Sequence, residues 1–271
     1  MLPYSPIHRL LLNGRPDLDA HVMTSGNLHG EPIVTGNDEA DEKLKGLADF
    51  FLKHNRGIVA ACDDSVVRLY RGKPVAIRRG RGYAPLALGL PLYGIPALAM
   101  GADLISSLGM SQGGRAYLSP HIGDMENLAT LEAFRRNFDH LSRFYQLAPE
   151  LVVHDAHPGY VSTEWALRYA AANSLLCHPV QHHRAHAAAV MAEYGLGPDA
   201  RVVAVVFDGT GYGDDGAIWG GEVFAGSLLR MERREHLSYV NLPGGDATAK
   251  RPPLSAIAHL HPAGLDWSDT R

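Results

Sequence analysis

The alternation of apolar runs with helical patterns in the second half of the chain most restricts its possible folds. Runs typical of strands recur between Ala97 and Asn241, and helical patterns separate several of them. Strands that alternate with helices build sheets covered by helices, so the predicted class is α/β. The expected strands are Ala97–Met100, Ile105–Met110, Arg115–Leu118, Leu151–His154, Val202–Phe207, Ile218–Ala225 and Glu235–Asn241, and the expected helices are Asn127–Tyr145, Thr163–Ala172, His182–Tyr194 and a pattern around Leu254–Leu260.

The first part of the chain carries weaker signals of regular structure. Apolar residues recur at spacings of three and four between Asp38 and His54, which predicts a helix capped by Asn37 or Asp38. Gly72-Lys73 indicates a hairpin, and Ser25-Gly26-Asn27 is typical of a turn. The strands expected here are Ile58–Ala61, Val66–Tyr70 and Val75–Arg78.

The stretch Tyr83–Pro96 separates the two parts. Three prolines and two glycines interrupt it, so a regular helix is not expected to run through it. We place a domain boundary there and expect one domain over residues 1–91 and a second over residues 92–271.

The composition excludes several classes of protein. A net charge of −4 gives no basic surface of the kind that binds nucleic acid. No apolar run reaches the length of a membrane span, and the first residues lack the pattern of a signal peptide. Cys62 and Cys177 are far apart and form no CxxC pair, which suits a reducing compartment. We therefore expect a cytoplasmic protein with neither nucleic acid nor membrane as a partner.

The pair His182 and His186 is the first candidate for a metal site. Four residues apart on a helix, the two imidazoles share one face and can bind one divalent cation. His183 is turned away by about a quarter of a turn and is not expected to join them. No glutamate follows His182, so the HExxH metalloprotease pattern is absent. Packed or exposed histidines would show the same spacing, and that alternative stays open.

Asp208 and the glycines after it form the second candidate. The continuous apolar run Val202–Phe207 predicts a buried strand, which would deliver Asp208 at its carboxyl end. The backbone of Gly209-Thr210-Gly211 could approach a phosphate, and Asp208 could coordinate a metal or hold a metal-bound water. A glycine-rich β-turn between two strands is the alternative.

A third candidate follows the strand Leu151–His154. His154, Asp155 and His157 come at its carboxyl end, and two histidines with an aspartate exceed what a helix cap needs. Any of them could bind substrate or transfer a proton. Ser162 or Thr163 is expected to cap the next helix. In the first part of the chain, Thr24, Ser25, Asn27 and Ser65 offer hydroxyls and an amide, although ordinary turns would contain the same residues.

Several motifs together resemble the HypF family of hydrogenase-maturation carbamoyltransferases. In the second part they are RAYLSPHIGDMENL, HDAHPGYVSTEWA, PVQHHRAHAAAVMAEYG, VVFDGTGYGDDGAIWGGEVF and LPGGDA. In the first part, LPYSPIHRLLL, VMTSGNLHGEPI, CDDSVVR and IRRGRGYAP are similar to the family's YrdC-like domain. The resemblance implies the C-terminal half of a YrdC-like α/β domain over residues 1–91. It implies the N-terminal half of a TsaD-like domain, of the actin/Hsp70-type ATPase superfamily, over residues 92–271.

The resemblance also implies a reaction and its participants. Carbamoyl phosphate yields carbamate, which ATP with Mg²⁺ converts to carbamoyl-adenylate. The carbamoyl group then passes to the C-terminal cysteine of the acceptor protein HypE. By this resemblance the metal ligands are His182, His186 and Asp208, with Fe or Zn as the cation. Asp208 and His157 are the catalytic candidates, and the nucleotide-binding candidates are Thr24, Ser25, Asn27, Ser65, Arg79, Gly209, Thr210 and Gly211.

The chain departs from the family pattern in several places. Gly159 stands where the family usually has Asp, and Arg184 where it often has His. The acylphosphatase and zinc-finger modules and half of each catalytic domain are missing, so we expect a truncated chain that is inactive alone. Two alternatives stay open: threonylcarbamoyl transfer to tRNA, as in TsaD proteins, and a non-catalytic remnant that binds a partner.

Overall fold

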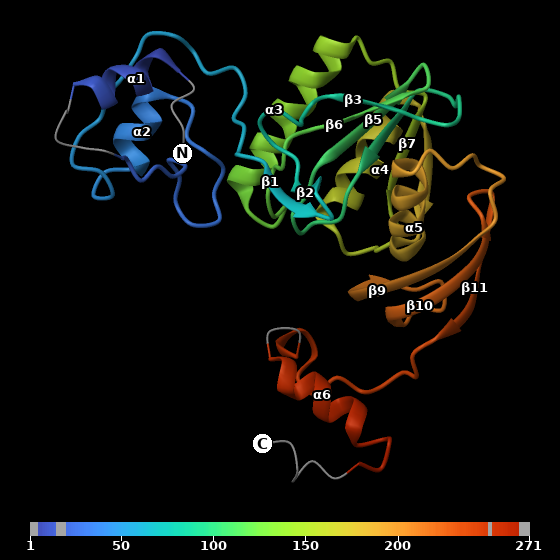
Figure 1. Cartoon of the computed structure of the whole chain (residues 1–271). Helices are drawn as coiled ribbons and strands as arrows, with labels where there is room; N and C mark the ends of the chain where they lie inside the picture. The colour runs from blue at the N-terminus through green and yellow to red at the C-terminus, as the bar shows by residue number, and fades with distance from the viewer. Residues whose placement is uncertain (1–4, 15–19, 249–250, 266–271) are drawn as a thin grey trace. The chain divides into compact units, whose positions relative to one another are not determined.

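The computed structural model of the chain describes residues 5–14, 20–248 and 251–265. Helices and strands alternate through most of the second half, which confirms the predicted α/β class (Figure 1). The chain forms two compact units. One consists of residues 1–86, 103–109 and 117–148, and the other of residues 87–102, 110–116 and 149–271.

The helices and strands are numbered in chain order. The helices are α1 (Pro6–Asn13), α2 (Asn37–Lys43), α3 (Leu128–Tyr145), α4 (Val161–Asn173), α5 (His182–Glu193) and α6 (Pro252–Leu260), with a 3-10 turn at Gly245–Ala247. The strands are β1 (Val66–Tyr70), β2 (Lys73–Arg78), β3 (Ala87–Gly89), β4 (Ala97–Met100), β5 (Leu108–Gln112), β6 (Arg115–Leu118), β7 (Leu151–Asp155), β8 (Leu176–Val180), β9 (Val202–Tyr212), β10 (Ile218–Ser227) and β11 (Arg230–His236).

A six-stranded sheet has the order β3-β6-β5-β4-β7-β8. In it β4 pairs with β7, and β7 with β8, in parallel. Asp155, the last residue of β7, lies opposite Val180, the last residue of β8. The carboxyl ends of these two strands therefore meet at one edge of the sheet, and α5 begins there, after Gln181.

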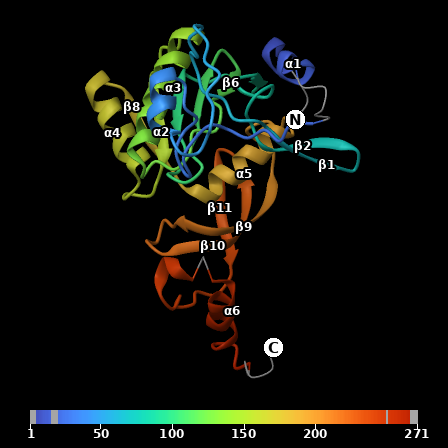
Figure 2. The ribbon, with the colours of Figure 1, turned by 90° about the vertical axis from the view of Figure 1, so that its left-hand side faces the viewer.

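A second, antiparallel sheet has the order β11-β10-β9. Helix α5 lies against β9 in both views of the ribbon (Figures 1 and 2). Ala187 of α5, Val206 of β9, and Trp219 and Phe224 of β10 form a buried apolar cluster between them. This packing holds the first turns of α5 beside β9.

Most of the predicted elements in the second half are confirmed. β4 and β6 have the predicted bounds, and α3 begins directly after Asn127, whose side chain accepts a hydrogen bond from Ala129 N. The elements β7, β10, α4, α5 and α6 agree with prediction to within a few residues. The hairpin predicted at Gly72-Lys73 also forms: Arg71 and Gly72 join β1 to β2. Gly113 and Gly114 likewise join β5 to β6, and all four residues have the positive φ that tight hairpin turns require.

The predicted helix Asp38–His54 is wrong beyond its first residues. α2 ends at Lys43 and is preceded by Gly36 as its N-cap, so neither Asn37 nor Asp38 caps it. Gly46 has φ +90°, which an α-helix cannot contain. Leu47 and Leu52, two residues of the apolar pattern, are each 65% exposed, so in the described part of the chain they are not buried as an amphipathic helix would require.

Three predicted strands are wrong or displaced. Residues 58–61 form no strand, and Val59 is 79% exposed. β5 begins at Leu108 because Ile105 turns away with φ +54° and donates its N–H to Asp124 Oδ1. The last predicted strand, 235–241, overlaps β11 only at its first two residues.

Two further expectations concern the cysteines and membranes. Cys62 and Cys177 are both free thiols. Among residues 5–14, 20–248 and 251–265, no helix combines the length and apolarity that a membrane span needs.

Candidate functional site

The fold brings the predicted metal ligands together from two elements. The Gln181 side chain caps α5 by accepting a hydrogen bond from Arg184 N, so His182 is the first helical residue and His186 follows one turn later. β9 runs along the same helix and carries Asp208. Residues 26 positions apart in sequence thus face one another.

Three ligand atoms converge in this cluster, which we call the His-His-Asp triangle (His182, His186 and Asp208). Asp208 Oδ2 lies 2.9 Å from His182 Nε2 and 3.3 Å from His186 Nε2. The two Nε2 atoms are 3.2 Å apart. Two imidazoles and one carboxylate are a common ligand set for a divalent cation that keeps an open position for substrate. The cluster is partly accessible, since the His186 side chain is 53% exposed.

Asp208 Oδ2 is the atom that best distinguishes this cluster from a chance gathering. It is buried, and no residue in the described ranges gives it a hydrogen bond of acceptable geometry, although two ring nitrogens lie within 3.3 Å. A buried carboxylate oxygen left in this condition is energetically unfavourable. A cation bound by all three atoms would satisfy it, so the residues present fit a metal.

The other ring nitrogen of His182 is also engaged. His182 Nδ1 lies 2.7 Å from Asp155 Oδ2. The hydrogen bond to Asp155 raises the pKa of His182, and burial opposes this rise only in part. For Asp155, burial raises the pKa, but hydrogen bonds from His182 and from His157 N outweigh it and leave a net lowering. The two groups thus favour each other's charged forms.

His183 lies outside the His-His-Asp triangle, in agreement with its predicted direction on the helix. Its side chain is fully buried, and Nδ1 lies 3.1 Å from Gln181 Nε2. Burial lowers its pKa and favours the neutral ring. His183 therefore belongs to the packing between α5 and β9.

The predicted phosphate loop is a strand in the structure. β9 continues through Asp208 to Tyr212, and Gly211 pairs with Trp219 of β10. The turn comes later, at residues 213–217. The run Val202–Phe207 is not a buried strand either: Val206 is buried, whereas Phe207 is 76% exposed. Both faces of β9 carry apolar residues in this run, so the sequence does not show the alternation of apolar and polar residues that is typical of an antiparallel strand.

Gly211 has a packing role that the strand explains. A Cβ atom at this position would lie 2.4 Å from His183 Cε1 and 3.1 Å from His182 Cβ. Only glycine lets α5 approach β9 this closely. We expect Gly211→Ala to destabilise the fold by about 1–3 kcal/mol, because α5 must move away from β9. Denaturant unfolding of the two proteins measures the difference.

Gly209 supplies the matched control for this change. It lies on the same strand, and a Cβ there would meet nothing within 4 Å. Gly209→Ala should leave the free energy of unfolding within about 0.5 kcal/mol of the original. Equal stability of the Gly211→Ala and Gly209→Ala proteins would contradict the packing role.

His157, predicted as catalytic, lies next to Asp155 in the loop after β7. Its ring stacks on Tyr160 with centroids 4.1 Å apart and meets Tyr212 edge-on. Its Nδ1 accepts a hydrogen bond from Gly159 N at 3.1 Å. The predicted cap of α4 is wrong: Tyr160 is the N-cap, and Ser162 and Thr163 are buried in the first turn.

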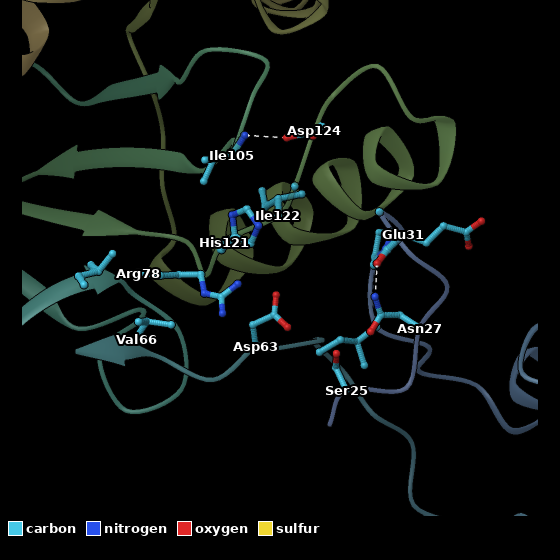
Figure 3. A pocket seen from close by; sticks show the side chains of 15 residues that line it. Ser25, Asn27, Glu31, Asp63, Val66, Arg78, Ile105, His121, Ile122 and Asp124 are labelled. Carbon is cyan, nitrogen blue, oxygen red and sulfur yellow. Dashed lines mark hydrogen bonds between the residues drawn. The ribbon is translucent and has the colours of Figure 1, made fainter. Parts of the chain in front are cut away.

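The nucleotide-binding candidates of the first part do not all gather. Ser25 and Asn27 line a pocket of about 590 Å³ (Figure 3). Asn27 is held there by hydrogen bonds from its amide to the carbonyls of Leu28 and Glu31. Thr24, Ser65 and Arg79 are not among the lining residues.

Ser65 and Arg79 support the backbone beside this pocket. Ser65 Oγ donates to Arg81 O and accepts from Gly80 N. Arg79 donates to Tyr83 O. Both side chains are thus used within the fold, and neither faces the pocket.

The pocket contains polar residues that sequence reasoning missed. Arg78, Asp63 and His121 point into it (Figure 3). Arg78 is the last residue of β2 and lines the pocket, whereas Arg79 follows the strand and its side chain donates to Tyr83 O instead. His121 lies within the family-like motif RAYLSPHIGDMENL, and this motif was the sequence feature that could have indicated His121 as a site residue.

Comparison with known proteins assigns the parts of the chain to families. Residues 94–193 match the sequence model of the HypF Kae1-like domain. Residues 204–271 match that of the carbamoyltransferase Kae1-like domain, second subdomain. Residues 1–80 match the Sua5/YciO/YrdC model, described as telomere recombination.

Curated relatives and solved structures agree with these matches. The chain is 43% identical to carbamoyltransferase HypF2 of Cupriavidus necator over 97% of its own length and 34% of the relative's. It is 41% identical to carbamoyltransferase HypF of Synechocystis sp., over 99% of the chain and 34% of the relative. A crystal structure of full-length HypF in its phosphate- and nucleotide-bound form matches with a TM-score of 0.87 and 41% identity, over 96% of this chain and 34% of that one. The HypF structure from T. kodakarensis gives 0.80 and 39%, over 88% and 31%.

The chain thus spans about a third of the length of the relatives it matches. The matched models together cover both parts of the chain, and their ranges include the residues of the His-His-Asp triangle and of the pocket of Figure 3. The chain belongs to the HypF family of carbamoyltransferases.

Proposed function

We propose that this chain carries the metal-binding part of an ATP-dependent carbamoyltransferase that acts in hydrogenase maturation. Its substrates would be ATP with Mg²⁺ and carbamoyl phosphate, and its acceptor the C-terminal cysteine of a HypE-type protein. The observation that supports this most strongly is the His-His-Asp triangle, with its buried and unsatisfied Asp208 Oδ2.

His182, His186 and Asp208 would hold the divalent cation. Two imidazole nitrogens and a carboxylate oxygen suit both Zn²⁺ and Fe²⁺, the two cations predicted. When bound, the cation supplies a Lewis acid that polarises a carbonyl or phosphoryl oxygen. The protein's own contribution is to fix the three ligand atoms, to leave one side of the cluster open, and to place His157 nearby for proton transfer.

The pocket of Figure 3 is the proposed site for the adenylate. Ser25 and Asn27 offer hydrogen bonds, and Arg78 offers a positive charge for a phosphate. The solved HypF with phosphate and nucleotide bound supports a nucleotide in this family. Gly209 and Thr210 are exposed and remain candidates for contacts with a nucleotide. They would make these contacts from the extended strand β9 and not from a loop.

We also propose the domain division and location that the sequence indicated. The boundary near Pro91 would separate a YrdC-like part from a TsaD-like part, and the matched models stop at residue 80 and resume at residue 94. Two free cysteines are compatible with a cytoplasmic protein.

A chimaera tests the proposed function. The matching segment of the Synechocystis sp. HypF is replaced by residues 1–271, and ATP-dependent carbamoyl transfer to a HypE-type acceptor is measured. In this protein Asp208→Asn should lower the rate at least about 100-fold, because the loss of a metal ligand removes several kcal/mol of transition-state stabilisation.

Asp199→Asn is the control for this change. Asp199 is exposed and lies outside the His-His-Asp triangle, so its replacement should leave the rate within about twofold. An active chimaera whose rate is unchanged by Asp208→Asn would refute the role of the triangle. The isolated chain, in contrast, is expected to show no transfer.

A further inference from the structure

We infer that Asp155 is a positioning residue: it orients His182 and fixes the ring tautomer that directs the Nε2 lone pair toward His186 and Asp208. This inference rests on the proposed metal site. Asp155 was not among the predicted ligands, and it does not touch the cation site itself. It acts through the far nitrogen of one ligand.

The two oxygens of Asp155 have separate partners. Oδ1 accepts a hydrogen bond from His157 N at 2.8 Å, and Oδ2 lies 2.7 Å from His182 Nδ1. The carboxylate is 6% exposed, so water competes little for either oxygen. Because an ionised carboxylate only accepts hydrogen bonds, the proton of a neutral His182 must reside on Nδ1. Nε2 then carries a lone pair.

The backbone of Asp155 is held on both sides. Thr163 Oγ1 donates to Asp155 O at 3.0 Å, and the next residue, Ala156, donates its N–H to Val180 O at the end of β8. Asp155 therefore reaches His182 from a rigid strand end. Carboxylates that accept from the second nitrogen of a metal-binding histidine orient the ring and raise its basicity in many metal sites.

Asparagine at position 155 tests the inference with little change of shape. Its single carbonyl oxygen cannot accept from both His157 N and His182 Nδ1. If the oxygen keeps the backbone bond, the amide donates to Nδ1 and moves the ring proton to Nε2. A comparable replacement beside a catalytic histidine is known to impose the wrong tautomer.

The experiment combines two readouts. Nitrogen NMR of histidine-labelled, metal-free protein, recorded at a pH high enough to leave the ring neutral, reports the tautomer of His182, identified by the signal that His182→Ala removes. Competition with a chromophoric chelator measures Zn²⁺ affinity. Asp155→Asn should shift the His182 signals toward the Nε2-protonated form and weaken Zn²⁺ binding about 10–100-fold.

Thr163→Val is the matched control. It removes the hydrogen bond that holds the backbone of Asp155 but leaves the carboxylate in place, so the His182 tautomer should not change. An unchanged tautomer in Asp155→Asn, or an equal shift in Thr163→Val, would overturn the inference. If the original chain binds no Zn²⁺, the proposed metal site fails, while the NMR readout still decides the role of Asp155.

Discussion

Replacing both His182 and His186 by alanine is expected to abolish stoichiometric binding of a divalent cation. The two rings supply two of the three converging ligand atoms, and Asp208 alone cannot retain the ion. Structural zinc sites with four ligands bind with about 10–16 kcal/mol, or roughly 3 kcal/mol per ligand, so two lost ligands should weaken binding by roughly four orders of magnitude. Metal analysis after dialysis and a chelator titration measure the change.

A double variant with the same number of changes serves as its control. His178 on β8 and His259 on α6 are both exposed and lie outside the His-His-Asp triangle. His178→Ala with His259→Ala should bind the cation as the original chain does. Retained binding in His182→Ala with His186→Ala would show that other residues hold the ion.

Replacing Glu222 by alanine is expected to produce a large loss of stability. Glu222 on β10 is 2% exposed, and its Oε2 lies 2.5 Å from Arg233 Nε. Its Oε1 accepts from Gly220 N and Gly221 N, where the pairing of β10 with β9 shifts register opposite Phe207. Without the Glu222 carboxylate, the largely buried guanidinium of Arg233 and the backbone N–H groups of Gly220 and Gly221 each lose one hydrogen-bond partner. Breaking such a buried pair costs about 3–5 kcal/mol.

The lower end of that range is expected, because Arg233 keeps other partners. It contacts Asp215 Oδ2 and Tyr239 OH, and it lies over the Trp219 ring at 4.0 Å. Glu235→Ala, an exposed change on β11, is the control and should alter stability by less than about 0.5 kcal/mol. If Glu222→Ala unfolded at the same denaturant concentration as Glu235→Ala, the ion pair would contribute no stability.

The network around Asp215 adds a dependence on pH to this region. A hydrogen bond from Tyr239, others from Ala217 N and Trp219, and the charge of Arg233 lower the pKa of Asp215 to about 2. Because the folded-state pKa is depressed, the contribution of Asp215 is present above its unfolded pKa of about 3.9 and is lost as pH falls toward 2. Since this carboxylate is 43% exposed, solvent screening keeps the contribution small.

Most helices and strands of the second half could be predicted from the sequence, because the local sequence pattern and the tertiary packing favour the same structure there. Asn127 caps α3 through its side chain, and the apolar strand Leu151–Asp155 has β-structure on both sides. In the first half they disagree. The spacing of Leu47 and Phe51 fits a helix, but Leu47 is 65% exposed among the residues that the structure describes, and Gly46, with φ +90°, cannot continue the helical backbone. Periodicity states which face could be buried, not whether a partner is present.

The metal ligands were predictable, but their supporting residues were not. His182 and His186 are four apart on a helix, and this local geometry needs no tertiary information. Asp208 was identified correctly as their neighbour, but it was expected at the end of a buried strand and lies within β9 instead. An antiparallel strand with apolar residues on both faces has the same sequence pattern as a buried parallel strand. Asp155 and Glu222 act through contacts 27 and 11 residues away in sequence, and no spacing rule connects them to their partners.

Anomalous X-ray diffraction from crystals of the chain soaked in Zn²⁺ tests the His-His-Asp triangle most directly. The expected result is one strong peak about 2.0–2.2 Å from His182 Nε2, His186 Nε2 and an Asp208 carboxylate oxygen. Data collected on both sides of the zinc absorption edge identify the element. No peak at this position at saturating zinc, with peaks only at other histidines, would contradict the proposed metal centre.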